Sequence, residues 1–263
     1  MSLIHINAIF KKTFKDMIRN KRQLFFFLLF PAMTYLFYFT IEDGKEMFPI
    51  VFLPINILFC SMNIMAGVIA EEKEKGTLRS LMFANVKPLE YFLGNGLFVL
   101  LATIFSTTLF VPLIEISGIN YLYYYLFTIL SSICSMVLGA TLGIIAKNQM
   151  SANGMCAPVT IIIGMLPTFG AMNESLRSIT EILYTTRFAD TIASIVSKTE
   201  VIIDYKIIIP LIYPVFYQIR RLIHKDDEKA LFEFFTNFCG YLFSGVVYLI
   251  IKYRMKKLNN NNN

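Results

Sequence analysis

The chain has 263 residues, of which 56% are hydrophobic and 16% are charged, and its formal net charge at pH 7 is +6. An average soluble domain carries about 25% charged residues, and a fold this apolar could not cover its surface with polar groups, so the composition excludes a soluble domain and predicts an integral membrane protein. The basic residues stand beside hydrophobic runs, where membrane topology explains them, and no nucleic-acid partner is expected.

The N-terminal arm, residues 1–23, has the pattern of a basic amphipathic helix. Apolar residues recur there at three- and four-residue spacing, with basic residues between them: Ile6, Phe10, Phe14, Met17 and Ile18 against Lys11, Lys12, Lys15 and Arg19. Such a helix lies along the inner membrane surface, and an unstructured basic anchor is the alternative. The apolar run that follows has no small-residue cleavage site, so we expect it to stay as an anchor rather than leave as a signal peptide.

Six apolar runs in residues 24–251 are long enough, or nearly so, to cross a membrane as helices, which takes about 20 residues. They are Leu24–Ile41, Ile50–Ala70, Leu93–Ile116, Leu122–Ala146, Met155–Ala171 and Leu231–Ile251. Prolines within the runs are expected to mark kinks, because neighbouring helices can satisfy the carbonyl groups that a proline frees. The predicted fold class is therefore all-α, with six transmembrane helices.

The distribution of lysine and arginine sets the orientation of these spans. Basic residues gather in the N-terminal arm, in segment 71–92, after the fourth run and in the basic, Asn-rich tail 252–263, whereas the opposite short loops hold only Lys45. This asymmetry places both termini and segment 71–92 in the cytoplasm of a multi-pass protein of the plasma membrane.

The outer loop, residues 172–229, contains the apolar stretch Ile207–Ile219. Thirteen helical residues rise about 20 Å, which is short of the membrane core of about 30 Å, and two prolines interrupt them. We expect a re-entrant or interfacial element here, because a seventh span would put the C-terminal tail outside.

A stripe of small residues marks the fourth run, with one residue every four positions: Ser131, Ser135, Gly139 and Gly143. Small residues on one face let helix backbones approach closely, so the stripe is predicted to be a helix-packing seam. The lining of a translocation path is the alternative.

Signs of catalysis are missing from the sequence. It has no phosphate-binding loop, no Ser-His-Asp set and no metal-binding spacing, and its four cysteines fall inside apolar runs, where packing explains them; His5 and His224 are expected at the interface. Acidic residues are nearly absent from the middle of the spans, which disfavours a secondary transporter or channel. Energy for transport would then come from another subunit.

Segment 71–92 opens with EEKEKGTLRSLM, a dense charged stretch between two apolar runs. Glu71–Glu74 would suit the N-terminal end of a short helix, and Leu78, Leu81 and Met82 would give that helix an apolar side for docking into a partner. A solvated turn is the alternative.

The stretch AGVIAEEKEKGTLRSLMFANVKPLEYFLGN resembles the signature of type-2 ATP-binding-cassette (ABC) exporter permeases. Two positions depart from it, Asn85 where a turn proline is usual and Asn95 where lysine is usual. The N-terminal arm resembles the elbow helix of that family, and Leu166–Ile192 resembles the exit of its fifth span towards re-entrant outer helices. The matching positions are Glu72, Gly76, Thr77, Leu78, Leu81, Glu90 and Gly94.

The resemblance implies a permease without catalytic residues that works with a separate ABC ATPase, which would bind ATP and magnesium, and with a second, identical or different, permease in the lipid membrane. It implies export of an apolar or amphipathic substrate such as a drug, an antimicrobial peptide or a lipid-like molecule, in a bacterium. A membrane immunity or sensor protein that binds a peptide toxin without transport is the rival. The implied ATPase-contacting coupling helix comprises Glu71, Glu72, Lys73, Glu74, Lys75, Gly76, Thr77, Leu78, Arg79 and Leu81.

The six-span topology places Lys225 outside the cell. In a variant without native cysteines, Lys225→Cys should therefore react with a membrane-impermeant maleimide added to intact cells. Labelling that requires permeabilised cells would contradict the six-span topology.

Overall fold

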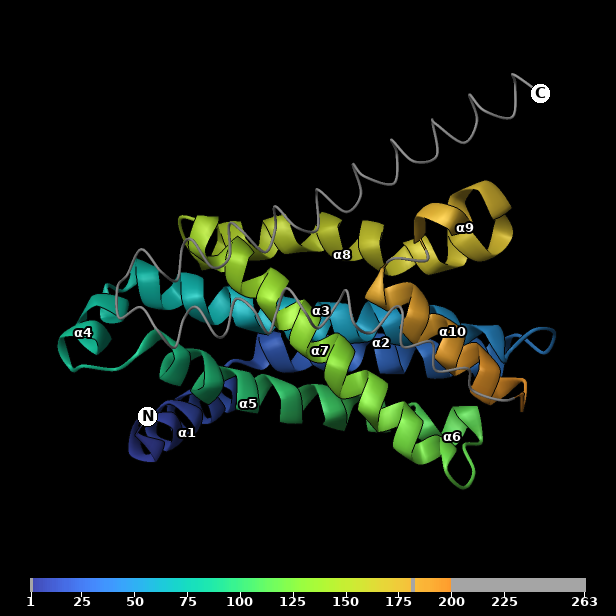
Figure 1. Cartoon of the computed structure of the whole chain (residues 1–263), viewed down its shortest axis with the longest axis horizontal. Helices are drawn as coiled ribbons and strands as arrows, with labels where there is room; N and C mark the ends of the chain where they lie inside the picture. The colour runs from blue at the N-terminus through green and yellow to red at the C-terminus, as the bar shows by residue number, and fades with distance from the viewer. Residues whose placement is uncertain (1, 181–182, 200–263) are drawn as a thin grey trace, which may run out of the picture.

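The computed structural model describes residues 2–180 and 183–199, and over these ranges the chain is helical, without a strand (Figure 1). The helices of this part are α1 (Leu3–Arg19), α2 (Lys21–Thr40), α3 (Met47–Glu74), α4 (Thr77–Phe83), α5 (Pro88–Thr108), α6 (Val111–Ile114), α7 (Asn120–Ile145), α8 (Gln149–Met172), α9 (Glu174–Thr180) and α10 (Tyr184–Val196). The stretch Ile207–Ile219, the sixth run and the tail 252–263 lie outside the described residues.

Four of these helices, α3, α5, α7 and α8, are long and apolar enough to cross a membrane. They correspond to the second to fifth predicted runs, whereas the apolar part of α2, Phe27–Thr40, is shorter. The all-helical, multi-pass membrane character is thereby confirmed.

The predicted third run, Leu93–Ile116, has the wrong boundaries. Helix α5 starts earlier, at Pro88, and ends at Thr108, and a separate short helix, α6, follows it. Pro112 explains the break, because its ring nitrogen has no hydrogen to donate to the carbonyl of Thr108 and its fixed φ suits the first turn of a new helix.

Helix α3 forms the centre of the bundle, packed against α7 and α8 and also contacting α2, α5 and α10. Helix α1 packs along α5. Figure 1 shows α1 and α4 at one end of the bundle and α6, α9 and α10 at the other. The N-terminal arm and segment 71–92, both expected in the cytoplasm, therefore share one end.

Two glycines of α7 allow the close approach of α3. A Cβ atom on Gly139 would lie 2.3 Å from the carbonyl oxygen of Met62, and one on Gly143 would lie 2.7 Å from that of Ala66. Ser135 serves a different neighbour, since its hydroxyl lies 2.9 Å from the Tyr184 hydroxyl of α10. Of the small-residue stripe, Gly139 and Gly143 lie against α3, and Ser131 is buried.

Hydroxyl groups of neighbouring helices satisfy two carbonyl groups that prolines leave free. Pro31 has no N–H for the carbonyl of Phe27, which instead accepts a hydrogen bond from Ser106 of α5 at 3.3 Å. Pro167 likewise frees the carbonyl of Ile163, which accepts one from Thr185 of α10 at 3.2 Å. These bonds provide, at both positions, the compensation that the prolines require in a membrane.

Uncharged polar groups join the central helices. Ser61 of α3 lies 2.9 Å from the hydroxyl of Thr103 on α5 and 2.8 Å from that of Ser132 on α7, and all three are fully buried. Asn56 donates to Ser106 at 3.0 Å. Because no water reaches such groups, each must find its partner inside the bundle.

A methyl group at Gly139 should separate α3 from α7. We expect Gly139→Ala to destabilise the protein by about 1–3 kcal/mol through overpacking, measured as a lower midpoint of thermal unfolding in detergent. Gly154→Ala is the control, because a Cβ atom there meets nothing within 4 Å. Equal midpoints for the two variants would contradict the close approach.

Thr185→Val should leave the Ile163 carbonyl unpaired and cost about 1 kcal/mol in the same measurement. Thr160→Val is the matched control, since that hydroxyl only bonds within its own helix, to the Cys156 carbonyl. The loss should shrink when Pro167→Ala restores a backbone donor for Ile163. If Thr185→Val lowers the stability equally with proline or alanine at position 167, the Thr185 hydroxyl acts in another way.

Candidate functional site

The charged stretch of segment 71–92 belongs to two helices. Glu71–Glu74 is the last turn of α3, so its prediction as the start of a short helix is wrong, and α4 begins only at Thr77. Gly76 separates the two with a φ of 70°. A Cβ atom there would meet nothing within 4 Å, so glycine is required for the left-handed backbone that ends α3 and not for space.

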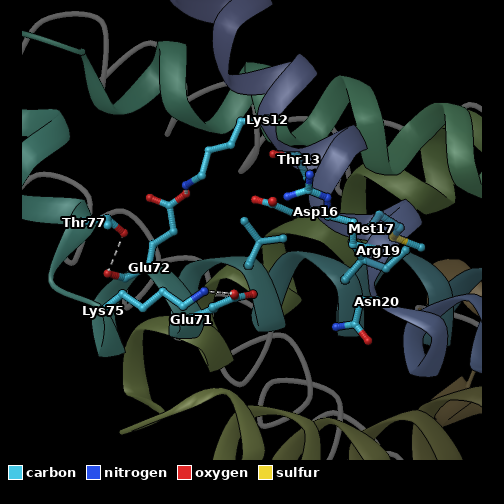
Figure 2. Close-up of a pocket in the computed structure, with 12 residues that line it drawn as sticks. Lys12, Thr13, Asp16, Met17, Arg19, Asn20, Glu71, Glu72, Lys75 and Thr77 are labelled. Atoms are coloured by element: carbon cyan, nitrogen blue, oxygen red, sulfur yellow. Dashed lines mark hydrogen bonds and ion pairs between the residues drawn. The ribbon is translucent and has the colours of Figure 1, made fainter.

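Acidic residues at the C-terminal end of a helix oppose its dipole and need partners. Glu72 is 5% exposed and forms an ion pair with Lys12 of α1. Glu71 pairs with Lys75 one turn later, and this hydrogen bond and the charge of Glu71 raise the pKa of the Lys75 ammonium above its ordinary value. Figure 2 shows Lys12 reaching from α1 to Glu72, and Lys75 beside Glu71.

The other two charges of this turn reach the connection between α7 and α8. Lys73 donates to the carbonyls of Ile144 and Ala146, at 2.7 and 3.0 Å, at the C-terminal end of α7. Glu74 accepts from the backbone N–H of Gln149, at 3.1 Å, at the start of α8. A cation at a helix C-terminus and an anion at an N-terminus both complement helix dipoles, so these contacts fasten α3 to that turn.

A second buried carboxylate lies at the other end of the segment. Glu90, in the first turn of α5, is 2% exposed and accepts hydrogen bonds from the backbone N–H of Ser2 at 2.6 Å and of Lys87 at 3.4 Å. The Nδ1 atom of His5 lies 2.8 Å from its Oε2 atom, so the imidazole donates there as the Nδ1–H tautomer. His5, expected only at an interface, thus has a specific partner.

Helix α4 turns its leucines inward. Leu78 and Leu81 are partly buried and pack against the hydrophobic cluster below, so they anchor α4 to the bundle. The outward apolar side chain is Phe83, which is 89% exposed, and Ser80 is exposed as well. The hydroxyl of Thr77 donates to the carbonyl of Glu72 at 3.2 Å and ties the start of α4 to α3.

The two departures from the family signature each have a local role. Asn85 follows α4 with a φ of 56°, a conformation that asparagine tolerates and that the ring of proline forbids. Asn95 is fully buried, accepts from the Thr13 hydroxyl at 2.6 Å and donates to the Tyr91 carbonyl at 3.2 Å. A lysine there would place an ammonium group between α1 and α5.

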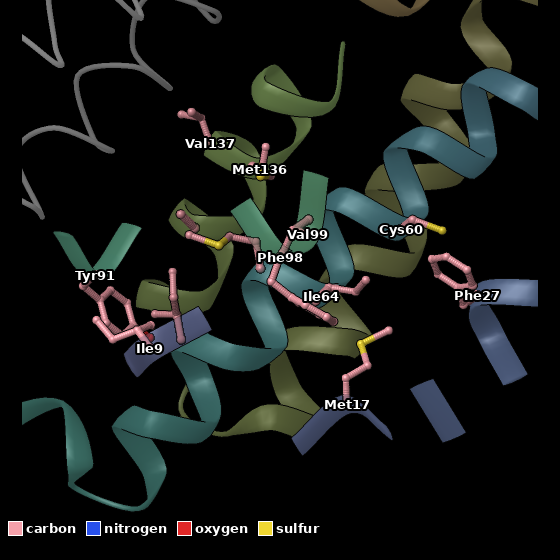
Figure 3. Packing of buried hydrophobic residues seen from close by; sticks show 13 residues of the cluster. Ile9, Met17, Phe27, Cys60, Ile64, Tyr91, Phe98, Val99, Met136 and Val137 are labelled. Carbon is pink, nitrogen blue, oxygen red and sulfur yellow. The ribbon is translucent and has the colours of Figure 1, made fainter. Parts of the chain in front are cut away.

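The face of α1 that packs against the bundle coincides only in part with the predicted apolar stripe. Phe14 and Ile18 are exposed, and the buried stripe is Ile6, Ile9, Thr13 and Met17. Gly94 causes the difference, because a Cβ atom there would lie 2.8 Å from the side chain of Ile9. Figure 3 shows Ile9 beside Tyr91, within the cluster that also holds Phe98 and Met17.

A cleft of about 580 Å³ separates the second half of α1 from the end of α3 (Figure 2). Charged side chains of both signs line it, including Asp16 and Arg19 on α1 and Glu71 and Lys75 on the opposite wall. Within the described part of the chain, no group of three or more His, Cys, Asp or Glu side chains could hold a metal ion.

Comparison with known proteins places these features in a family. The family model described as ABC-2 type transporter matches residues 4–198, well over half of the chain. Comparisons with curated proteins and with solved structures give no match. The match confirms the resemblance seen in segment 71–92, and the multi-pass helical bundle agrees with it. The chain belongs to the ABC-2 type transporter family, as a membrane permease subunit of an ABC transporter.

Proposed function

We propose that the chain is the permease of an exporter, and that α4 is the coupling helix seated on a separate ABC ATPase, which binds and hydrolyses ATP. One observation carries this proposal: Phe83 is 89% exposed on a short helix at the end of the bundle, although Leu78 and Leu81 fix that helix from below. An anchored helix with an outward aromatic residue suits insertion into a partner's pocket, since aromatic residues dominate interface energetics.

The proposed ATPase contact moves from the predicted set within Glu71–Leu81 to the exposed part of α4, Ser80 and Phe83. Three charged side chains at the end of α3 are engaged inside the chain, with Lys12, the end of α7 and the start of α8. These engaged side chains support the start of α4, so Ser80 and Phe83 remain as the exposed residues that would contact the ATPase.

The bundle interior favours an apolar or amphipathic substrate. Its buried polar groups, such as Asn56, Ser61 and Thr103, are uncharged and bond to other side chains. A smaller cavity of about 170 Å³ lies between α2, α3 and α8, and Phe27, Phe59, Ile64 and Ala157 give it largely apolar walls. A drug, an antimicrobial peptide or a lipid-like molecule fits such surroundings better than an ion does.

Exposed apolar side chains support the proposal that a second permease and membrane lipid surround the bundle. Helix α8 is the least buried of the four candidate spans, and Ile161, Ile162 and Phe169 are exposed on it. A second, identical or different, permease or lipid would cover this face. Helix α1 would lie as the elbow helix on the inner surface of a bacterial plasma membrane, with Phe14 and Ile18 towards the lipid.

Phe83→Asp should weaken binding of the ATPase encoded beside this chain about 10- to 100-fold, which is the size expected for a lost aromatic anchor. The measurement is a titration of the labelled permease, in detergent, with the purified ATPase. Ile119→Asp is the control, because Ile119 is 64% exposed at the opposite end of the bundle. Unchanged affinity for Phe83→Asp, or an equal loss in the control, would contradict the seating of α4.

A further inference from the structure

Helix α1 holds both ends of segment 71–92. Lys12 pairs with Glu72 at the end of α3, and His5 hydrogen-bonds Glu90 at the start of α5. These two residues of α1 are seven positions apart, which is about two helical turns or about 10.5 Å, so they lie on one face of the helix. Thr13, which follows Lys12 in α1, bonds Asn95, which lies five residues beyond Glu90 in α5.

Burial makes these contacts obligatory. Both carboxylates are nearly inaccessible, at 5% for Glu72 and 2% for Glu90. A buried charge without a partner is strongly unfavourable. Neither carboxylate can therefore lose its contact with α1 unless another group replaces the side chain of Lys12 or His5. Gly94 brings α1 and α5 close enough for this, since a side chain there would collide with Ile9.

The helix between the two acids has bends on both sides. Gly76 precedes α4 and Asn85 follows it, both with positive φ. Residues of this kind absorb a change in backbone direction. A displacement of α4 alone could therefore be absorbed at these two bends without moving α3 or α5. A fixed link between the two ends of the segment prevents that loss.

We propose that His5 and Lys12 are positioning residues, through which α1 acts as a strap that keeps the ends of α3 and α5 in register with α4. This inference rests on the proposed function of α4 as the ATPase contact. When the ATPase displaces α4, the strap moves α1, the end of α3 and the start of α5 together. Lys73 and Glu74 extend the same displacement to the turn between α7 and α8.

The first experiment needs no ATPase. Spin labels at Lys15→Cys on α1 and Ala84→Cys directly after α4, both exposed positions, report the distance between the two helices by pulsed electron resonance in a background without native cysteines. We expect one narrow distance distribution in the unaltered strap and at least a twofold broader one after Lys12→Met or His5→Leu. Lys11→Met is the matched control and should stay narrow.

Conservative variants guard against simple misfolding. Lys12→Arg and His5→Gln keep a donor for each carboxylate and should restore the narrow distribution, and so should the charge swap Lys12→Glu with Glu72→Lys. Equal widths for Lys12→Met and Lys11→Met would overturn the strap. So would a broad distribution that neither the conservative variants nor the swap restore.

The second experiment adds the ATPase with ATP and vanadate. The distance from Ala84→Cys to a label at Ile119→Cys, at the start of α7 beside the α6 end of the bundle, should shift, while the distance from α1 to α4 stays constant. A shift of both distances would overturn the strap but not the coupling role of α4. Failure of the ATPase to bind the unaltered protein would instead overturn the proposed function, and the first experiment would still decide whether α1 links the two ends.

Discussion

The ion pair between Lys12 and Glu72 is the contact on which the end of the bundle depends. Four charged residues end α3, three of them acids at the unfavourable pole of a helix, and three of the four reach three different helices. Glu72 pairs with Lys12 of α1, Lys73 bonds the end of α7, and Glu74 bonds the start of α8. A single helical turn therefore fixes three other helices relative to the most buried span of the protein.

Inside the bundle a second constraint takes over, which is the absence of water. The hydroxyl and amide groups of Ser61, Thr103 and Ser132 and of Asn56 and Ser106 are uncharged and paired there. Prolines are tolerated because a hydroxyl of another helix replaces the lost backbone donor. Ser106 shows both effects, since it bonds the Phe27 carbonyl that Pro31 frees and also bonds Asn56. The charges at the end of the bundle that holds α1 and α4, and the hydroxyls of the interior, both supply partners for groups that would otherwise be unpaired.

Length and hydropathy were enough to predict the four long spans, and the motif around Gly76 was enough to predict the family. The end of α3 was predictable too, because a lysine followed by glycine is a helix-stop signal, but the charge pattern outweighed it. Pro112 carried a similar signal for the end of α5. The partners of Glu72 and Glu90 could not be predicted, since they lie 60 and 85 residues away and no local periodicity encodes them.

Those sequence separations also order the assembly of the chain during its synthesis. Helix α1 leaves the ribosome before α3 and α5. Lys12 can form its ion pair only after the end of α3 has been made, and His5 can bond its partner only after the start of α5 has been made. Until the end of α3 has been made, α1 has neither Glu72 nor Glu90 as a buried partner, and these contacts do not yet fix its place in the bundle. Helix α1 can therefore take its final place only after α5, although it precedes α5 in the chain by almost 70 residues.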